Sequence, residues 1–374
     1  MAKEILKKIV NKKSPIKSGI TWLDEIRYIY LLSALVLITA FFLLLFFGFN
    51  YLSSIFSGTS LVDTVQEKIE QKSECTSRRL VDGLCLQGNE NNNPPLVVAM
   101  IDNHMDARPQ SGLSEAVLVY EAPVEGNYTR FMAFYIMDEK VESVGPIRSA
   151  RPYFLDWTEE YGKPMYFHVG GSPQALQLIK NYNIFDFNEF FRSWYFWRSV
   201  DRLAPHNTYT SSELWKKGFD KYSYEASSTK FSSWKYEDYE NCHEDECVTE
   251  ITINYLSYYF EPTWKYNTST EKYVRYENNA IKKDKNGSKI IADNIIVQFV
   301  ESRVIDGVGR LDIETIGEGK ALVFTAGRVF EGTWKKPNRQ ARTKWYNENG
   351  EQINLTVGTT WVQVTPQSTK TEWK

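Results

Sequence analysis

Acid–base chemistry is the first function that the side chains of this chain suggest. Asp102 and His104 directly follow the apolar run 96–101, and Glu121 ends a second run of strand length. His206 lies in a turn farther along the chain. A carboxylate beside an imidazole can transfer protons or bind a metal ion. The alternative is a polar turn in which Asp102 bonds its own backbone. The catalytic candidates are therefore Asp102, His104, Glu121 and His206.

Three of the four histidines, His104, His168 and His206, fall in the same half of the chain. Three imidazoles with Asp102 or Glu121 would suit a zinc or manganese site. Separation in sequence says nothing about convergence in space, and histidines that hydrogen-bond within the fold are the favoured alternative. We therefore predict no metal and no cofactor.

Arginines around an expected helix start suggest an anion site. Arg148 and Arg151 flank Ser149, which we expect to cap the helix, and the free N–H groups of a helix start favour an anion. The alternative is internal pairing with Glu121 and Glu125. Anion binding and internal pairing are compatible if the internal ion pairs form when no ligand is bound. The predicted ligand-binding residues are Arg108, Arg130, Arg148, Arg151, His168 and Asn207.

Common catalytic signatures are missing from the chain. It contains no G-x-S-x-G, H-E-x-x-H, Walker or dinucleotide-binding motif. That excludes the most easily recognised enzyme classes and leaves open whether the protein is an enzyme. A formal charge of -3 provides no basic field for nucleic acid, which we do not expect as a partner.

Alternating strands and helices must position these groups. Apolar runs of strand length occupy 96–101, 116–121, 129–137 and 165–169. Helices are expected at 152–161, at 173–180 after the N-cap Ser172, and up to about residue 222. This order predicts a mixed α/β domain over residues 95–240.

The pattern changes after residue 247. Short β-branched and aromatic runs follow one another, separated by turn signals such as Asn286-Gly287 and Asn349-Gly350. No long amphipathic helix interrupts them. We predict an all-β domain, a barrel or sandwich, over residues 248–366.

An apolar segment near the start predicts a membrane anchor. Residues 29–49 are 21 residues without a charged side chain, and a helix of that length spans about 31 Å, enough for a bilayer core. A buried core helix or a cleaved signal peptide are weaker alternatives, because the run lacks a polar face and an A-x-A-like cleavage site. The expected order is a basic tail 1–28, a transmembrane helix 29–49, and a stalk with a linker that a cysteine pair closes over 50–94.

The charges around this segment predict its orientation. Residues 1–28 carry seven Lys and Arg against three Asp and Glu, and the next basic residue after the segment is Lys68. The positive-inside rule then places the tail in the cytoplasm. We expect a single-pass protein of the cell membrane with residues 50–374 extracytoplasmic.

The four cysteines agree with an oxidising compartment. Cys75 lies close to Cys85, and Cys242 close to Cys247, so two local disulfides are the simplest pairing. Zinc binding, with His243 beside the second pair, and free thiols remain as alternatives.

Five motifs in order resemble the YerB-type lipoprotein family. They read IDNHMDARPQSGLSEA, VYEAPVEGNYTRF, GPIRSARPYF, HVGGSPQAL and DRLAPHNTY, and the resemblance continues through KALVFTAGRVFEGTWKK to about residue 366. It implies a membrane-bound bacterial envelope protein with a mixed N-terminal and a β-rich C-terminal domain. It supplies no activity, cofactor or catalytic residue. The chain departs from the pattern because a transmembrane segment replaces the lipobox cysteine, and the Cys pairs are an addition.

Three functions fit these observations. The first is an envelope factor without catalysis, which binds an anionic or glycan-type ligand, such as a cell-wall fragment, or a protein partner in an arginine-rich pocket. The second is a hydrolase or transferase acting on envelope polymers through Asp102, His104, Glu121 and His206, with or without a metal. The third is a tethered scaffold whose β domain holds a partner protein.

Overall fold

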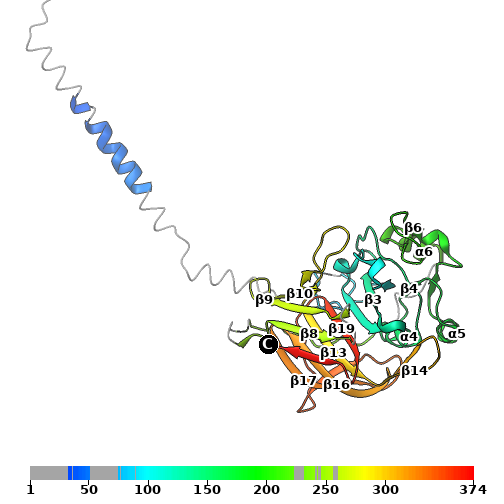
Figure 1. Cartoon of the computed structure of the whole chain (residues 1–374). Helices are drawn as coiled ribbons and strands as arrows, with labels where there is room; N and C mark the ends of the chain where they lie inside the picture. The colour runs from blue at the N-terminus through cyan, green and yellow to red at the C-terminus, as the bar shows by residue number, and fades with distance from the viewer. Residues whose placement is uncertain are drawn as a thin grey trace, which may run out of the picture. The chain divides into compact units, whose positions relative to one another are not determined.

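A mixed sheet of ten strands runs through the larger of two units, Met1–Glu74 and Cys75–Lys374, in the computed structural model of the chain (Figure 1). The structure describes residues 33–35, 37–50, 75, 77–88, 90–222, 231–240, 242, 246–255 and 260–374. The predicted basic tail 1–28 and residues 51–74 of the predicted stalk and linker lie outside these residues.

The smaller unit contains the helix Ser33–Asn50, which is long and apolar enough to cross a membrane. Its large apolar side chains are exposed. It lies within the segment predicted from sequence, except for one residue at its end.

The ten-stranded sheet combines strands from both halves of the sequence. Its order is β18-β17-β16-β13-β19-β2-β3-β1-β4-β5. The central pair β19 and β2 is parallel, with Thr360 opposite Leu118, so the two predicted regions share one sheet. The strands are β1 Leu96–Asp102, β2 Leu118–Pro123, β3 Thr129–Ile136, β4 Met165–His168, β5 Asp186–Asn188, β13 Asn294–Val300, β16 Gly317–Thr325, β17 Arg328–Lys336, β18 Lys344–Asn347 and β19 Thr360–Pro366.

A second sheet belongs to the C-terminal half. It runs β11-β10-β9-β8-β20, with β12 paired to β10. The class expected from sequence is confirmed, with a mixed α/β N-terminal region and a β-rich C-terminal region. The strands are β8 Glu250–Asn254, β9 Thr263–Asn267, β10 Lys272–Glu277, β11 Ala280–Ile281, β12 Ile291–Ala292 and β20 Lys370–Trp373; two small ribbons pair β6 Trp197–Arg198 with β7 Thr208–Tyr209, and β14 Ser302–Val304 with β15 Leu311–Ile313.

Among the residues that the structure describes, three α-helices cover the ten-stranded sheet. They are α4 Pro152–Thr158, α5 Pro173–Asn181 and α6 Ser212–Tyr222. Ser172 caps α5 as expected, accepting a bond from the backbone N–H of Ala175 at 3.2 Å. The prediction that Ser149 caps α4 is wrong. Arg151 occupies the cap position in an extended conformation, and no side chain bonds the helix start there.

The core consists of an apolar layer on each face of the sheet. From β1, Val97 and Ala99 join the layer that contains Trp215 of α6. Val98 and Met100 join the opposite layer, which includes side chains of α4 and α5. Every residue of β1 is buried, because both faces of the strand are covered, and this explains its nearly continuous apolar sequence.

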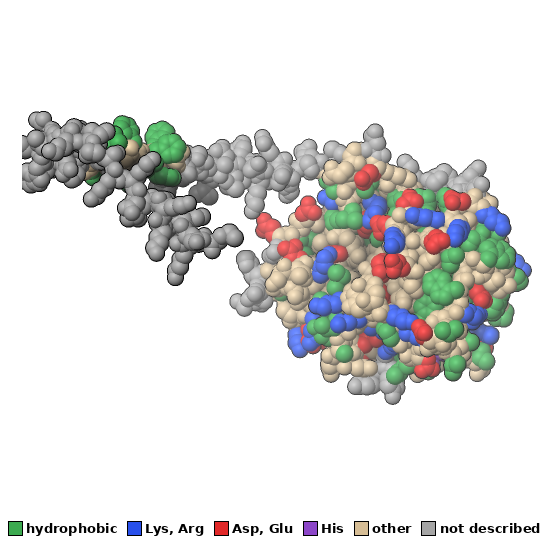
Figure 2. Space-filling model, turned by 90° about the horizontal axis from the view of Figure 1, so that it is seen from above, with side chains coloured by type: hydrophobic (Ala, Val, Ile, Leu, Met, Phe, Trp, Pro, Cys, Tyr) green, Lys and Arg blue, Asp and Glu red, His purple; other side chains and the backbone are tan. Residues whose placement is uncertain are grey.

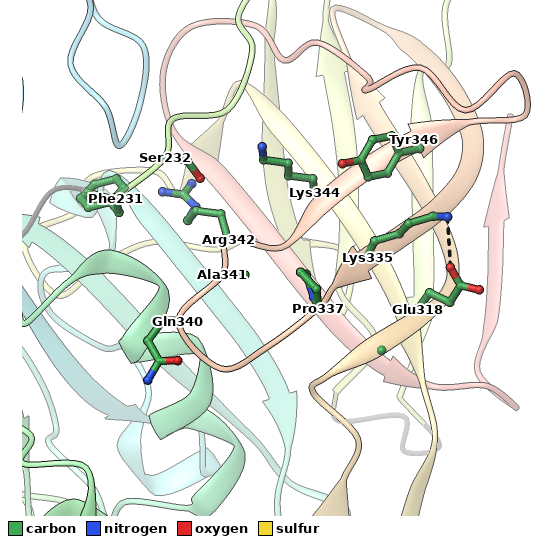
Figure 3. Close-up of a pocket in the computed structure, with 11 residues that line it drawn as sticks. Phe231, Ser232, Glu318, Lys335, Pro337, Gln340, Ala341, Arg342, Lys344 and Tyr346 are labelled. Carbon is green, nitrogen blue, oxygen red and sulfur yellow. Dashed lines mark ion pairs between the residues drawn. The ribbon is translucent and has the colours of Figure 1, made fainter.

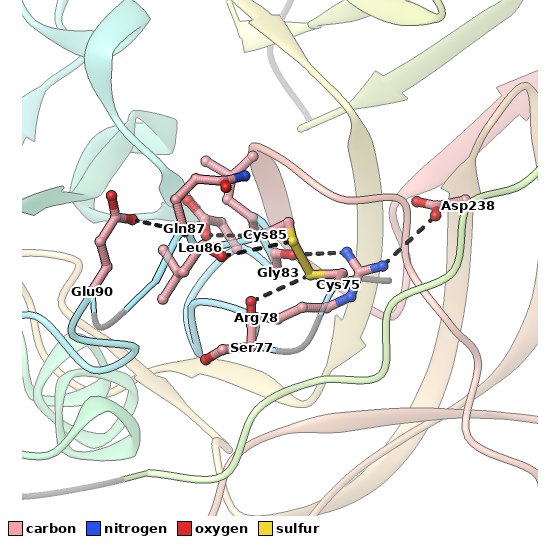
Figure 4. Close-up of a disulfide and its surroundings, with 11 residues drawn as sticks. Cys75, Ser77, Arg78, Gly83, Cys85, Leu86, Gln87, Glu90 and Asp238 are labelled. Atoms are coloured by element: carbon pink, nitrogen blue, oxygen red, sulfur yellow. Dashed lines mark hydrogen bonds and ion pairs between the residues drawn. A yellow bond between two sulfur atoms is a disulfide. The ribbon is translucent and has the colours of Figure 1, made fainter. Parts of the chain in front are cut away.

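Both predicted disulfides are present, Cys75–Cys85 and Cys242–Cys247. Around the first, the guanidinium of Arg78 donates to the carbonyl of Gly83 at 3.0 Å and lies 3.7 Å from Asp238 (Figure 4). The described residues include no free cysteine. His243, the extra ligand of the zinc alternative, lies outside them.

One face of the larger unit is mixed in charge. Figure 2 shows acidic and basic side chains interspersed over the face in view, with apolar patches scattered among them. This distribution agrees with the small net charge of the chain.

Candidate functional site

The ends of two paired strands bring the first charged groups together. Asp102 closes β1 and lies opposite Arg130 in the antiparallel pairing with β3. The segment after the strands passes beside them, because the N–H of Asp102 bonds Pro146 and the N–H of Arg148 bonds Met100, each at 2.8 Å. Backbone pairing alone therefore brings Asp102, Arg130 and Arg148 to one sheet edge.

Asp102 is the centre of this edge. Its Oδ2 lies 3.0 Å from Nε of Arg148 and 2.6 Å from Nδ1 of His206. Its Oδ1 accepts the backbone N–H of His104 at 3.0 Å. Two predictions from sequence thus meet in space: Asp102 is the strand-end carboxylate, and His206 reaches it from a turn about a hundred residues later along the chain.

Electrostatics keep Asp102 ionised. Burial would raise the pKa of its carboxyl group, but the charges of Arg130 and Arg148 hold that pKa below its ordinary value, helped by bonds from His104 and His206. An ionised carboxylate only accepts hydrogen bonds, so Nδ1 of His206 carries the proton toward Asp102. The other ring nitrogen, Nε2, is then left without a proton in the neutral imidazole.

Two further guanidinium groups surround this centre. Arg130 donates to the carbonyl of Ser149 at 2.6 Å, and Arg151 forms a forked pair with Glu125 at 2.6 and 2.7 Å. We call the set Asp102, Glu125, Arg130, Arg148, Arg151 and His206 the arginine cluster.

The arginine cluster has more positive than negative charge. Burial lowers the pKa of Arg130 to about 10, and the neighbouring charges of Arg151 and Arg148 add to that shift while Asp102 opposes it. The buried Nε atom of Arg130 has no hydrogen-bond acceptor in the part of the chain that the structure describes, and Nε of Arg148 has only its ion-pair contact with Asp102. Three guanidinium groups therefore face two carboxylates.

The two histidines form the exposed rim. The rings of His104 and His206 stack with centroids 4.5 Å apart and 20° between their planes, and Tyr128 lies 4.7 Å from His104. Nδ1 of His104 accepts the backbone N–H of Asp106 at 3.2 Å. Side-chain exposure is 29% for His104 and 13% for His206, so solvent reaches this rim.

A metal ion could bind at the same rim. Donor atoms of His104, Asp106 and His206 all lie within 4.8 Å of one another. Asp102, bonded to Nδ1 of His206, would then orient that ring from outside the ligand shell, as carboxylates do for metal-bound histidines. Asp106 was not among the residues selected from sequence; its position two residues after His104 was the available signal.

Glu121 and Arg108 belong to a second, more buried network. Glu121 pairs with Arg275 of β10 at 2.8 Å, and Glu277 contacts Arg275 at 3.1 Å and Lys282 at 2.7 Å. Arg108 lies 3.1 Å from Glu277. The charges of Lys282, Arg275 and Arg108 overcome burial and lower the pKa of Glu277 to about 2. Glu121 is fully buried, so these residues tie β2 to the second sheet.

His168 and Asn207 have separate partners. His168 is fully buried between the carbonyl of Gly170, 2.7 Å from its Nδ1, and the carboxylate of Asp186. Asn207 bonds Arg198 at 3.1 Å and the carbonyl of Ser199 at 3.2 Å. Both residues stabilise loops, and none of these bonds reaches the arginine cluster.

Comparison with known proteins finds the same two-part organisation. Residues 83–225 match the "Protein of unknown function (DUF3048) N-terminal domain", and residues 251–362 match the corresponding C-terminal domain. The chain is 32% identical over 287 residues to the Bacillus subtilis (strain 168) protein described as "Putative lipoprotein YerB", covering 72% of this chain and 81% of that protein. The crystal structure of YerB from Bacillus subtilis superposes with a TM-score of 0.68 at 28% identity, covering 79% of this chain and 99% of the other.

Proposed function

This chain belongs to the DUF3048 family that includes YerB, and we propose that it is a membrane-anchored protein of the bacterial cell envelope that binds an anionic ligand in the arginine cluster. A phosphate or carboxylate group of an envelope component, such as a cell-wall fragment, has the chemistry that this cluster would accept. Catalysis is not required for this function.

One observation carries the proposal. Arg130 has a buried Nε–H group with no acceptor among the described residues, in a cluster with an excess of positive charge in which Nε of Arg148 contacts only Asp102. A buried donor without a partner costs about 1–3 kcal/mol, and more when it is charged. An anion that accepted the hydrogen bond of Arg130 would remove this cost, and charge-assisted bonds to arginine are among the stronger ones in proteins.

Access to the cluster favours a ligand over a purely internal role. The side chain of Arg148 is 25% exposed although it contacts Asp102. Arg151, by comparison, already donates two bonds to Glu125 and one to the carbonyl of Ala150. We infer that the partly exposed Arg148 and His206 bind the ligand first, and that Arg130 contributes positive charge from the buried side of the cluster.

Calorimetric titration of the full chain in detergent with inorganic phosphate tests the proposal. We expect saturable binding that weakens as sodium chloride is added, because salt screens charge. Arg148→Met should weaken it by about tenfold or more, equivalent to ~1.4 kcal/mol. Arg303→Met is the matched control, because Arg303 is 78% exposed and its ion-pair partner among the described residues is Asp312. Equal phosphate affinity in Arg148→Met and the wild type would refute the site.

The helix Ser33–Asn50 supports the anchored location, as does the word lipoprotein in the name of the Bacillus subtilis relative. Val308 is 64% exposed in the larger unit, so Val308→Cys offers a reactive thiol. A membrane-impermeant maleimide should label that thiol on intact, wall-free cells. Labelling that needs cell lysis would place the larger unit in the cytoplasm and contradict the proposed orientation.

A hydrolase or transferase is the second candidate, and the orientation of His206 favours it. Asp102 fixes the Nδ1 proton, which leaves Nε2 free to accept a proton or to bind a metal ion with His104 and Asp106. Equilibrium dialysis with zinc checks the metal version: we expect about one ion per chain, lost in His206→Gln. Absence of stoichiometric zinc would exclude that version, and a metal-free reaction would then need Nε2 as the base.

A further inference from the structure

A pocket lies in the C-terminal half, separate from the arginine cluster. Its walls come from β16, β17, β18 and the segment at Phe231, and its volume is about 640 Å³ (Figure 3). None of its lining residues belongs to the arginine cluster or to the network around Glu121. A cavity of this size fits a sugar or another small molecule.

Arg342 in the wall of this pocket is electrostatically unusual. Its side chain is buried, and none of its three guanidinium nitrogens has a hydrogen-bond acceptor among the described residues. The charge lies instead against aromatic rings, 3.9 Å from the centroid of Trp234, 4.2 Å from that of Tyr161 and 5.2 Å from that of Phe231. Cation–π contacts offset part of the cost of burial, each by about 0.5–2 kcal/mol.

The neighbouring carboxylates are committed to other residues. Glu160 is fully buried, lies 2.9 Å from Nζ of Lys336 and accepts two bonds from Thr343. Glu318, at the pocket wall, lies 3.1 Å from Lys335 (Figure 3). Arg342 is therefore a buried cation without an anionic partner in the described structure, which is rare because the desolvation penalty is large.

The rest of the wall has the chemistry of an acidic-sugar site. Lys344 also lines the pocket, and no ion pair to it occurs in the described ranges. Arg342, Lys335 and Lys344 together outweigh the single carboxylate of Glu318. Tyr346 and Phe231 supply ring faces against which a sugar can pack, and Gln340 and Ser232 supply polar groups for hydroxyls.

We propose that this pocket is a second ligand site, which binds a saccharide carrying a carboxylate or phosphate group. The acid group binds between Lys344 and Arg342, and the sugar ring lies along Tyr346. A small shift of the Phe231–Ser232 wall brings the guanidinium into contact with the acid group. The inference goes beyond binding in the arginine cluster and does not depend on it.

Calorimetric titrations of the full chain in detergent with glucose 1-phosphate and with glucuronate test this site. Each carries one of the two acid groups, and uncharged glucose is the control ligand. We expect millimolar, saturable binding of at least one acid, and much weaker binding of glucose, because the charged group supplies most of the affinity. If neither acid binds at millimolar concentrations, the proposal is overturned.

Lys344→Gln is the principal variant, because it removes a charge from the pocket and leaves the aromatic rings around Arg342 unchanged. It should weaken binding of the acidic sugar by about tenfold and leave the melting temperature unchanged. Lys217→Gln is the matched control on α6, where Lys217 is 61% exposed and pairs with Glu213. Equal affinity in Lys344→Gln and the wild type would overturn the site.

Arg342→Met and Arg148→Met complete the design. Arg342→Met should abolish binding of the acidic sugar. If Arg342 only stabilises the fold, the same change would lower the melting temperature and leave the affinity of the folded protein for the sugar unchanged. Arg148→Met should not alter this affinity. If Arg148→Met weakened binding as much as Lys344→Gln did, the sugar would be bound in the arginine cluster, and the second site would be refuted.

Discussion

At the scale of single residues, Asp102 organises the candidate site. One carboxylate contacts Arg148, orients His206 and accepts the N–H of His104. The sequence indicated Asp102, His104 and His206 because polar groups at strand ends and in turns stand out from apolar surroundings. It could not show the excess charge, because that depends on which arginine faces which carboxylate in three dimensions.

Asp102 should make stability depend on acid pH. Its folded pKa is lowered by Arg130 and Arg148, so its contribution is complete above the unfolded pKa, at about 4, and is lost as pH falls through the folded value. Asp102→Asn should therefore lower the free energy of unfolding by about 1–3 kcal/mol at neutral pH. Urea unfolding at neutral pH and near pH 2 checks this. A difference between the two proteins that did not shrink in acid would contradict it.

Asp284 should act in the opposite direction. Burial raises its pKa to about 6, and its buried Oδ1 has no hydrogen-bond partner among the described atoms. The folded state then holds a proton that the unfolded state releases, so the free energy of unfolding falls as pH rises from about 4 to about 6. Asp284→Asn should remove this slope and stabilise the protein by about 1–2 kcal/mol at neutral pH. Thermal melts over that range measure both effects, and an unchanged slope would be inconsistent with the assignment.

At the scale of elements, strand pairing decides what the sequence can reveal. Strands β1, β3 and β4 and the capped start of α5 were predictable from the sequence. Their hydrophobic periodicity and the turn and cap residues at their ends are local signals. The register that places Asp102 opposite Arg130 is not local. Neither is the pairing of Glu121 with Arg275, residues 154 positions apart. The prediction that Ser149 caps α4 is wrong, because Arg151 adopts the extended cap conformation directly before Pro152.

The Cys75–Cys85 disulfide should stabilise the start of the larger unit. It closes a loop with a sequence separation of 10 residues, and loop entropy gives about 2–3 kcal/mol for that length. Cys75→Ser with Cys85→Ser should lower the free energy of unfolding by roughly that amount, measured by urea unfolding without reductant. The same pair of changes at Cys242 and Cys247 is the comparison. Loss of less than ~0.5 kcal/mol would mean that the loop adds little.

At the scale of the whole molecule, the two halves of the sequence share one sheet and one buried charge network. β19 pairs with β2, and Arg275 of β10 pairs with Glu121 of β2. The hydrophobic pattern of the sequence indicates a mixed α/β N-terminal half and an all-β C-terminal half. It does not indicate that strands from both halves join edge to edge, because hydrophobic patterning carries no information about which strands are neighbours.

The Glu121–Arg275 pair should be strongly coupled. Arg275→Met leaves Glu121 buried without its main partner and should cost about 3–5 kcal/mol. Adding Glu121→Gln should recover part of that loss, because the uncompensated charge is gone. Unfolding of the two single variants and the double variant gives the coupling energy. Additive losses would contradict a direct interaction between the two halves.

The measurement that bears most directly on the central claim is NMR of the arginine Nε–Hε groups in the full chain during titration with inorganic phosphate. Arg130 has a buried Nε group without an acceptor among the described residues, and the partly exposed Arg148 lies beside it on Asp102, whereas Nε of the exposed Arg303 bonds Asp312 at 3.1 Å. We predict that the Arg130 and Arg148 signals move together and saturate while the Arg303 signal stays in place. Stationary Arg130 and Arg148 signals in the folded protein would show that the arginine cluster does not bind the anion.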